Sequence, residues 1–374
     1  MKKTRILFDN LYLTRGGVEV FMNTLIAWLP RDRYDITVAA VHWDKNDPND
    51  RVPEGVRFIR RYHRRKHYKR YSLRWFLDTG FGRVYDALVS LYLSLLNFDL
   101  VIAAQEKQTM RRADALRAKR KIAWVHTDYT TRLNNWKASF PSPEAERACM
   151  ARFEKVVCVS ETVRQGLIQA IGDPGNLVVC YNPIDVRRIL RLSEEPCPLQ
   201  RDPMRPLLVS VGRLVAEKQY LVLLQAVKAL RESLDFELWI IGDGEERPML
   251  ERYIAENGLT NVRLLGTQAN PFTYLREADL FVSSSQTEGY GLTVQEALVL
   301  GVPVVAVACP GVAESLDTRF GILTENSPSA LADGIRSMLE PETLADYRAR
   351  IAAEYPRDAL YKKRLEAIGA LLEK

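Results

Sequence analysis

Short apolar runs rich in Val, Ile and Leu recur along this 374-residue chain and alternate with segments of helical pattern. Continuous apolar runs of this kind are typical of strands buried on both faces, which means parallel sheets. Strands that alternate with helices predict right-handed βαβ units and an α/β fold. The runs cover residues 6–8, 36–41, 100–104, 122–125, 156–159 and 178–180, and then 207–211, 238–241, 262–265, 280–282 and 302–307.

Helical patterns fill several of the gaps between these runs. Val18, Phe21, Met22 and Leu25 share one face of a helix, and residues 221–230 carry a similar stripe. Ser327 followed by Pro328 predicts a helix N-cap and a first-turn proline. Residues 356–374 also have a helical pattern.

One stretch breaks the alternation. Residues 193–206 contain four prolines and charges of both signs, which is typical of a linker. We therefore expect two Rossmann-like doubly wound domains that face a central cleft. The N-terminal one covers residues 1–192 and the C-terminal one residues 207–355, with a C-terminal helix at 356–374.

Composition narrows the class of protein. The five cysteines include no Cys-x-x-Cys, so we expect reduced thiols rather than a zinc or redox site. The net charge of +6 favours anionic partners without identifying one. The first apolar run is too short for a signal peptide, and no run reaches the ~18 residues of a membrane span. We expect a cytoplasmic protein, or one peripheral on the inner face of the cell membrane.

Glycines and cations follow the first strand of each half. Gly16 and Gly17 lie between a strand and a helix, where backbone N–H groups can approach a phosphate. Gly212 follows the strand at 207–211 and leads to Arg213 and Lys218, which are placed to bind a diphosphate. Taken alone, either loop could equally be an ordinary turn or a surface salt bridge.

A pair of glutamates is the most specific signal. Glu288 is followed by Gly289, Tyr290, Gly291 and Leu292, and Glu296 comes after seven intervening residues. The glycines allow unusual backbone angles that turn N–H groups toward a ligand. Carboxylates accept hydrogen bonds from paired hydroxyls, so the two glutamates are suited to a sugar and a ribose. The competing interpretation is a helix N-terminus with two solvated glutamates.

These residues resemble the "glycosyl transferases group 1" family, which are retaining enzymes of the two-domain GT-B fold. The resemblance covers nearly the whole C-terminal half and is thinner in the N-terminal half. It rests on Gly212-Arg213-Leu214, Glu217-Lys218, Ile241-Gly242-Asp243-Gly244, Leu265-Gly266, Ala278-Asp279 and the two glutamates, and earlier on Gly16-Gly17-Val18-Glu19, Val125-His126, Val159-Ser160-Glu161 and Asn182-Pro183-Ile184-Asp185. Gln219 departs from the family, which commonly has glycine there, and this leaves the local loop path open.

The resemblance implies a role for each site residue. Arg213 and Lys218 would bind the donor diphosphate, helped by backbone at Gly16, Gly17 and Gly212. Glu288 would hold hydroxyls of the transferred sugar, with Gly289 and the N–H groups of Tyr290, Gly291 and Leu292 nearby, and Glu296 would bind the ribose. Backbone near Leu265 and Gly266 would meet the base, and His126 would lie beside the donor sugar. The final helix would pack back on the first domain.

The chemistry of the residues agrees with a metal-independent reaction. Asp-x-Asp, the usual carboxylate clamp for a sugar-nucleotide metal, does not occur in the chain. Cations and helix-end N–H groups can stabilise the departing diphosphate instead. No cofactor or metal is expected. We expect a hexose to be transferred from a nucleotide-diphosphate sugar, UDP-linked by family habit, to a glycan or polyprenyl-diphosphate-linked acceptor in bacterial surface polysaccharide biosynthesis. A product of inverted configuration would contradict the mechanism.

Residues 57–74 form a basic segment with nine Lys or Arg, no Asp or Glu, and interleaved aromatic residues. An apolar, helical stretch follows at 84–96. The combination is suited to an anionic membrane surface or a lipid-linked acceptor, through a patch of Arg60, Arg61, Arg64, Arg65 and Lys66. A solvated loop beside an ordinary core helix is an equally simple interpretation. Nucleic acid is disfavoured because no nucleic-acid motif accompanies the charge.

Other functions stay open at this point. A sugar-nucleotide epimerase could use the same scaffold, and so could a non-catalytic binding subunit of a glycan-assembly complex. A nicotinamide oxidoreductase is disfavoured, because Gly242-Asp243-Gly244 continues to Arg247 where the dinucleotide motif needs glycine.

Overall fold

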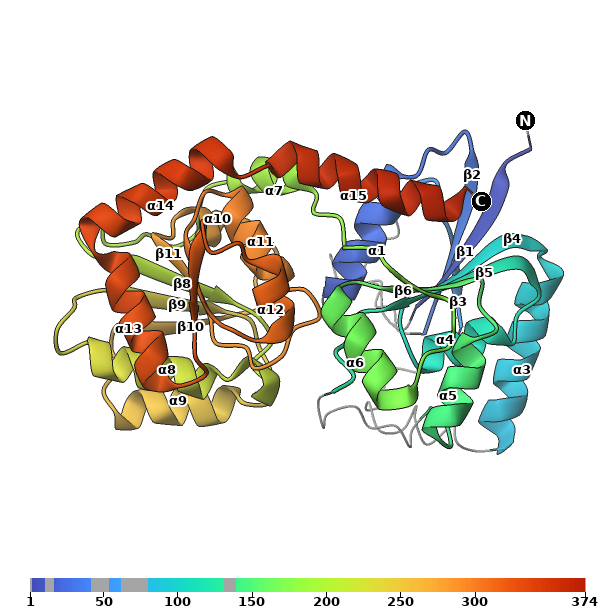
Figure 1. Ribbon diagram of the computed structural model, residues 1–374, viewed down its shortest axis with the longest axis horizontal. Coiled ribbons are helices and arrows are strands. Elements are labelled where there is room, and N and C mark those ends of the chain that lie inside the picture. The colour runs from blue at the N-terminus through green and yellow to red at the C-terminus, as the bar shows by residue number, and fades with distance from the viewer. Residues whose placement is uncertain (1, 11–16, 42–53, 62–79, 131–138, 374) are drawn as a thin grey trace. The chain divides into compact units, whose positions relative to one another are not determined.

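The structure is a computed structural model that describes residues 2–10, 17–41, 54–61, 80–130 and 139–373. The chain forms two compact units, Met1–Tyr181 and Asn182–Lys374 (Figure 1). Helix α7 (Val186–Ser193), which precedes the proline-rich segment, belongs to the second unit.

The described residues of the first unit form a seven-stranded sheet in the order β3-β2-β1-β4-β5-β6-β7. Every neighbouring pair is parallel, as the continuous apolar runs predict. The order reverses between β1 and β4, so their carboxyl ends diverge into a crevice where α/β proteins bind ligands. The strands are β1 (Thr4–Asn10), β2 (Tyr34–Ala40), β3 (Arg57–Arg60), β4 (Phe98–Ala103), β5 (Ala118–Val125), β6 (Lys155–Cys158) and β7 (Leu177–Val179).

Described helices follow β1, β3, β4, β5 and β6 in the chain (Figure 1). Helix α1 begins at Gly17 and buries Phe21, Met22 and Leu25, which confirms the predicted apolar face. Ser160 caps the helix after β6 by accepting a hydrogen bond from the Val163 amide. The described helices are α1 (Gly17–Trp28), α3 (Gly80–Leu95), α4 (Gln108–Asp114), α5 (Pro143–Met150) and α6 (Glu161–Ile171).

The second unit contains a six-stranded parallel sheet in the order β10-β9-β8-β11-β12-β13. Its order reverses between β8 and β11, which places a second ligand crevice at the carboxyl ends of these two strands. The strands are β8 (Leu207–Val211), β9 (Glu237–Ile241), β10 (Val262–Gly266), β11 (Leu280–Ser283), β12 (Val304–Val307) and β13 (Gly321–Thr324).

Helices cover both faces of this sheet, and each face has its own apolar core. One core joins α8, α9 and α13 to alternate strand residues such as Leu208 and Ile240. The other core joins α10, α11 and α12 to their neighbours Leu207 and Trp239. The helices are α8 (Tyr220–Leu230), α9 (Arg247–Glu256), α10 (Phe272–Arg276), α11 (Leu292–Val299), α12 (Pro310–Ser315), α13 (Pro328–Leu339), α14 (Pro341–Glu354) and α15 (Arg357–Leu372), with a 3-10 turn at Ala216–Lys218.

Local signals explain where several elements begin. Ser327 accepts a hydrogen bond from the Ala330 amide at 3.1 Å, and Pro328 opens α13, as the sequence predicts. Helix α15 packs on α7, where Tyr361 contacts the cluster around Ile189. The expectation that α15 packs on the first unit stays a prediction.

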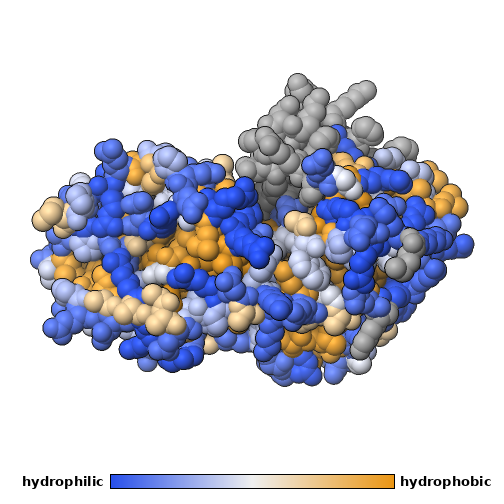
Figure 2. Space-filling view, turned by 90° about the horizontal axis from the view of Figure 1, so that it is seen from above, coloured by the Kyte–Doolittle hydropathy of each residue, from blue (hydrophilic) through white to orange (hydrophobic). Residues whose placement is uncertain are grey.

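Surface and core have the polarity of an ordinary globular protein. Hydrophilic residues cover most of the face in Figure 2, and apolar residues lie between them in separate patches. All five cysteines are free, and burial raises the pKa of Cys149 and Cys158 to about 12, so both thiols are inert at neutral pH. None of the helices in the described part of the chain has both the length and the apolar character of a membrane span.

Candidate functional site

The candidate site of the second unit lies at the carboxyl ends of β8 and β11, where the strand order reverses. Lys218 forms an ion pair with Glu288, through its Nζ and the carboxylate Oε1. Ser285 donates a second hydrogen bond to the same Oε1 at 2.9 Å. The other oxygen, Oε2, accepts no hydrogen bond from a described residue, so it is available to a ligand hydroxyl. The structure thus brings together one predicted cation and one predicted carboxylate.

Backbone hydrogen bonds tie the loops of this site to one another. The Ser284 hydroxyl donates to the carbonyl oxygen of Lys218 at 2.8 Å. The Gln286 amide donates to the carbonyl oxygen of Glu217 at 2.9 Å. The loop that carries Lys218 and the loop that carries Glu288 are therefore held in register, which fixes the distance between the two charged groups.

Close packing explains the glycines of the neighbouring loops. A Cβ at Gly242 would lie 1.8 Å from the carbonyl oxygen of Gly212, and one at Gly244 would lie 2.2 Å from that of Leu214. The amide of Gly242 also donates to the carbonyl oxygen of Gly266 at 2.9 Å. Only glycine allows the ends of β8, β9 and β10 to approach this closely.

The predicted base-binding segment is internally bonded. Gly266 has a φ of +69°, and the carbonyl oxygen of Leu265 accepts a hydrogen bond from the Gln268 side chain at 2.6 Å. Tyr274 donates to Gln268 in turn, at 2.9 Å. These bonds fix the backbone at Leu265 and Gly266, and the contact of this backbone with a base stays a prediction.

Gln219 resolves the open question about the loop path. It has a φ of +48° and a ψ of 42°, the left-handed conformation that glycine adopts most easily. The loop therefore follows the path that a glycine would allow, and Gln219 tolerates the strain while its side chain donates to Gln286 at 3.1 Å. The departure from the family leaves the position of Lys218 intact.

Arg213 is exposed two residues beyond β8. It has no hydrogen-bond or ion-pair partner among the residues that the structure describes. A free guanidinium at the carboxyl end of a strand can reach an anionic ligand as a two-pronged donor.

The glycine-rich turn after β11 presents the start of α11. Gly291 has a φ of +67° and a ψ of 50° at the N-cap, so it cannot cap the helix with a side chain. The N–H groups of Leu292 and its neighbours are placed where a helix N-terminus attracts anions. A Cβ at Gly311 would lie 2.0 Å from the carbonyl oxygen of Glu288, so α12 also packs directly on this turn.

Tyr290 points its side chain into the unit rather than toward a ligand. It is buried, and its hydroxyl lies 2.6 Å from Nη2 of Arg364 in α15. The Arg364 guanidinium also lies 5.1 Å from the centre of the Tyr290 ring and donates to the Asn182 carbonyl oxygen at 3.1 Å. Any role for Tyr290 and Gly289 in binding must therefore use their backbone.

Glu296 lies in α11, near Arg188 of α7. Burial raises the pKa of Glu296 to about 7, and the positive charge of Arg188 opposes this shift. A buried carboxyl group that titrates near neutral pH is a candidate functional residue, and its contact with a ribose stays a prediction.

His126 belongs to the first unit and follows β5 directly. Burial lowers the pKa of His126 to about 4, although Glu106 and a hydrogen bond to Ala104 favour the protonated ring. The imidazole is therefore neutral at pH 7 and packs 5.1 Å from the Phe21 ring. Its Nε2 is buried with no hydrogen-bond partner in the described part of the chain, so it can accept a bond from a hydroxyl.

Glu106 is a site residue that the sequence analysis missed. Its carboxylate accepts a hydrogen bond from the His126 amide at 3.1 Å and another from the Thr127 hydroxyl. The signal was present, since Glu106 comes shortly after a predicted buried strand, where site residues of parallel sheets gather. Gly17 begins α1 as expected, whereas Gly16 lies outside the described residues.

The basic patch requires a correction. Arg61 is fully buried, and its Nε and Nη2 donate to the carboxylate of Asp9 at 2.9 and 2.8 Å. It cannot meet a membrane or a lipid headgroup, because a paired cation is sealed inside the unit. Arg60 is half-buried at the end of β3. Arg64, Arg65 and Lys66 lie outside the described residues.

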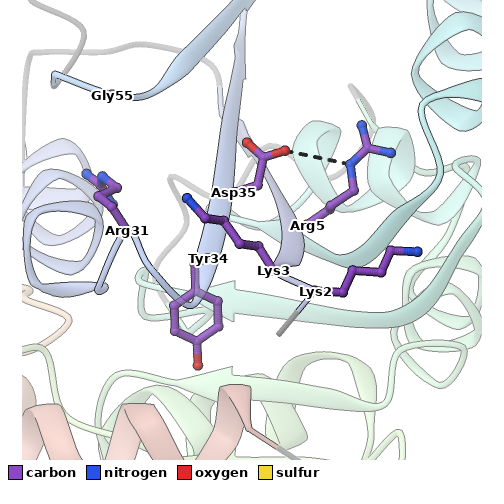
Figure 3. A pocket seen from close by; sticks show the side chains of 7 residues that line it. All are labelled: Lys2, Lys3, Arg5, Arg31, Tyr34, Asp35 and Gly55. Atoms are coloured by element: carbon purple, nitrogen blue, oxygen red, sulfur yellow. Dashed lines mark ion pairs between the residues drawn. The ribbon is translucent and has the colours of Figure 1, made fainter.

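A cavity of about 500 Å³ lies elsewhere in the first unit, at the amino ends of β1 and β2. Figure 3 shows Lys2, Lys3 and Arg5 around Asp35, with Arg31 across the cavity. It lies at the sheet edge opposite His126 and is separate from the candidate site. No group of three or more metal-binding side chains occurs in the described ranges. Metal independence stays a prediction.

Comparisons with known proteins find a glycosyltransferase family model that matches each half of the chain. The "Glycosyl transferases group 1" family model matches residues 194–355, and the "Glycosyltransferase Family 4" model matches residues 15–188. An uncharacterized glycosyltransferase of Methanocaldococcus jannaschii is 24% identical over 224 residues, 59% of each chain.

Two further relatives have named activities or pathways. An N-acetylgalactosamine-N,N'-diacetylbacillosaminyl-diphospho-undecaprenol 4-alpha-N-acetylgalactosaminyltransferase of Campylobacter jejuni is 30% identical over 175 residues, 46% of each chain. An amylovoran biosynthesis glycosyltransferase of Erwinia amylovora is 28% identical over 217 residues, 52% of this chain and 53% of the other. The matched part of this chain thus spans about half the length of these curated relatives.

Solved structures show the fold. HepE of Anabaena, in complex with UDP and glucose, has a TM-score of 0.75 at 19% identity, covering 98% of this chain and 100% of the other. Sucrose-phosphate synthase of Thermosynechococcus elongatus has a TM-score of 0.79 at 17% identity, covering 99% of both. The predicted α/β fold of the GT-B type is confirmed.

Proposed function

We propose that this chain, which belongs to the glycosyl transferases group 1 family of GT-B enzymes, transfers a hexosyl unit with retention of anomeric configuration. The donor is a nucleotide-diphosphate sugar, and the acceptor is a hydroxyl group of a glycan or a polyprenyl-diphosphate-linked sugar. The observation that carries this proposal is the Lys218–Glu288 pair at the strand-order reversal of the second unit.

The pair suits the two ends of an activated sugar. Negative charge grows on the leaving diphosphate as its bond to the anomeric carbon breaks, and Lys218 and Arg213 are the cations available to stabilise it. Glu288 presents Oε2 to hydroxyls of the transferred sugar. Since Glu288 also holds Lys218 in place, one carboxylate orients both the sugar and the cation.

The reaction needs no strong base from the protein. The acceptor oxygen forms its bond to the anomeric carbon on the face that the diphosphate leaves, and the acceptor proton passes to a phosphate oxygen of the leaving group. A neutral His126 with a pKa of about 4 is a weak base, so its role is to accept a hydrogen bond from a donor-sugar hydroxyl.

The relatives support the substrate classes. HepE of Anabaena was solved with UDP and glucose, which supports a UDP-hexose donor. The Campylobacter relative acts on a diphospho-undecaprenol-linked sugar, and the Erwinia relative serves amylovoran biosynthesis. We propose an acceptor of this kind in surface polysaccharide biosynthesis, reached from the inner face of the membrane, and a reaction that uses no metal.

A panel of nucleotide sugars, scored by nucleotide release with and without acceptor, tests the proposal. Lys218→Ala and Glu288→Gln should each lower kcat/KM by about 100-fold or more, since each removes stabilisation of the transition state. Lys228 is an exposed cation on α8, so Lys228→Ala is the matched control and should leave kcat/KM unchanged. EDTA should leave the rate unchanged, and the product should keep the donor's anomeric configuration by NMR. An inverted product, or an epimerised donor without acceptor, would contradict the proposal.

A further inference from the structure

Helix α3 of the first unit exposes its apolar side chains. Five large apolar residues at helical spacing lie on one face, and each has more than half of its surface in contact with solvent. Contiguous exposed apolar side chains of this kind mark an interaction surface rather than an ordinary solvated helix. We call this face the α3 stripe; it comprises Val84 (60% exposed), Leu88 (59%), Leu91 (56%), Tyr92 (54%) and Leu95 (69%).

The opposite face of α3 carries polar residues and points into the unit. Asp86 accepts a hydrogen bond from the buried Arg61 at 3.4 Å. The Ser94 hydroxyl donates to the carbonyl oxygen of Ser90 at 2.8 Å and accepts from the Arg117 amide at 3.0 Å, and both serines are buried. The inward face of the helix therefore buries these two serines together with Leu93, while most of its other large apolar side chains face solvent.

These inward bonds lock the rotation of the helix. Turning α3 to bury the leucines would remove Asp86 from Arg61, which sits fully buried between Asp9 and Asp86. It would also leave the Arg117 amide without Ser94. Because breaking a buried ion pair is costly, the α3 stripe faces outward as a fixed feature of the fold.

Cations precede the α3 stripe in the sequence and lie near its C-terminal end. Residues 57–74, which precede the helix in sequence, contain nine Lys or Arg and no acidic residue. At its other end, Arg117 is exposed beside Ser94, and the Arg5 guanidinium lies 5.7 Å from the ring of Phe98, three residues after the helix. Arg5 also lines the cavity of Figure 3, together with Lys2, Lys3 and Arg31.

We infer that α3 is the membrane-binding element of this protein and lies in the plane of an anionic bilayer. Val84, Leu88, Leu91 and Leu95 would enter the acyl chains, and Tyr92 has the apolar ring and polar tip that favour the interface. The flanking cations would meet lipid phosphates. An anionic bilayer matches both the apolar stripe and the positive charge, whereas a second copy of this basic chain would match only the first.

This surface differs from the predicted patch, which included the buried Arg61. It rests on the proposed function only for its purpose, which is to bring a lipid-linked acceptor within reach. Binding to vesicles is measured without nucleotide sugar or acceptor. Absence of vesicle binding would therefore contradict only the membrane-binding surface, and absence of transferase activity would contradict only the proposed function.

Flotation of the full chain with vesicles tests the inference. The protein should float with vesicles of phosphatidylcholine containing phosphatidylglycerol, more weakly with phosphatidylcholine alone, and less at high salt. The triple variant Leu88→Gln, Leu91→Gln, Leu95→Gln should bind at least about tenfold more weakly, because it removes apolar area from the interface. Leu190→Gln with Met204→Gln alters exposed apolar residues of the second unit and serves as the matched control.

A reporter at the surface gives an independent measurement. Tyr92→Trp should shift its tryptophan emission to shorter wavelength with anionic vesicles and be quenched by brominated lipid, relative to the same change in the triple variant. Unchanged flotation of the triple variant, or an unshifted reporter, would overturn the inference. A wild-type dimer in ultracentrifugation that the triple variant converts to a monomer, without vesicle binding, would assign the α3 stripe to self-association instead.

Discussion

Glu296 links donor binding to pH. Its pKa of about 7 arises from burial in α11, and a ribose hydroxyl donates best to the ionised carboxylate. We expect the affinity of the wild-type protein for UDP to increase between pH 6 and pH 8, as the carboxyl group loses its proton. Calorimetry across this range measures the effect, and a glutamine at this position should bind UDP more weakly with no pH dependence.

The same carboxyl group should make the stability of the protein decrease with pH, whereas the affinity for UDP increases. An ordinary glutamate has a pKa of 4.5, so between pH 4.5 and about 7 the folded state binds more protons than the unfolded state. The protonated Glu296 carboxyl group therefore makes its full contribution to the free energy of unfolding below pH 4.5, and this contribution is lost as the pH rises to about 7. Glu296→Gln should therefore raise Tm by a few degrees at pH 8 and hardly at all at pH 4.5. If Glu296→Gln raised Tm equally at pH 8 and pH 4.5, the ionised carboxylate of Glu296 would not be buried in the folded protein.

Gln219 stores strain that a single change should release. An L-residue in the left-handed region costs roughly 1–2 kcal/mol relative to glycine. Gln219→Gly releases this strain, but the glycine loses more entropy on folding and the bond to Gln286 is lost, so we expect a net stabilisation of at most about 1 kcal/mol. Thermal unfolding measures this change, and Gln286→Ala, which removes only the hydrogen bond, is the control. A lower Tm for the glycine variant would contradict the assignment of strain.

At this scale the sequence predicts residues that belong to a motif after a predicted strand, even where the partner is distant, since Lys218 and Glu288 lie 70 residues apart. Lys218 and Glu288 come from motifs with fixed spacing after predicted strands, and the structure brings them together. Arg61 could not be placed in this way. Its cationic neighbours suggest a surface, and no motif connects it with Asp9, its buried partner 52 residues away.

Helix α15 acts on the site through Arg364. This buried guanidinium contacts the Tyr290 hydroxyl, the Asn182 carbonyl oxygen and Oε1 of Gln295, and so connects the helix to the turn that carries Glu288. We expect Arg364→Met to destabilise the protein by about 2 kcal/mol or more, since several buried polar atoms lose a charged donor. The donor KM should also rise.

Two variants separate anchoring of the turn from general destabilisation. Tyr290→Phe removes one contact of Arg364 and should raise the donor KM with a smaller loss in Tm. Arg357→Met, at the start of the same helix, should leave the KM unchanged. Steady-state kinetics well below the Tm of each variant make the comparison, and an unaltered KM in Arg364→Met would show that α15 does not position the turn.

Among the described elements, every central strand is predicted from the sequence, whereas only two of the four edge strands, β7 and β10, are. The ends of the predicted apolar runs lie within four residues of the ends of the corresponding strands, because strands buried on both faces must be apolar. Strands β3 and β13 lie at sheet edges, have four residues each, and were missed. The pattern of α3 predicts a helix but not its orientation, which depends on Asp86 and the buried Arg61.

For the whole molecule, the repeated pattern of strand and helix predicts two sheets, but it does not predict the residue at which the first unit ends and the second begins. The second unit places its candidate site at the reversal of strand order between β8 and β11, whereas His126 of the first unit follows β5, one strand beyond the reversal between β1 and β4. Helix α7 joins the second unit because Ile189 and Val186 pack on Phe272 and Val299, contacts between residues distant in sequence. Proline content at 193–206 gives no information about such contacts.

Four predicted donor-binding side chains, Arg213, Lys218, Glu288 and Glu296, lie in the second unit, and His126 lies in the first. This unit has its own apolar cores on both faces of its sheet, so residues 182–374 should fold alone. We expect that fragment to bind UDP within about tenfold of the affinity of the full chain. It should release no sugar to an acceptor, because His126 belongs to the first unit.

Calorimetry with UDP on residues 182–374, residues 1–181 and the full chain makes this comparison. Lys218→Ala in the fragment should weaken binding as it does in the full chain, which distinguishes the site from incidental affinity. If residues 1–181 bound UDP and a folded 182–374 did not, the phosphate-binding cations would have to be sought in the first unit. The ion pair of Lys218 with Glu288 would then be a structural contact, since its two charges would satisfy each other rather than a substrate.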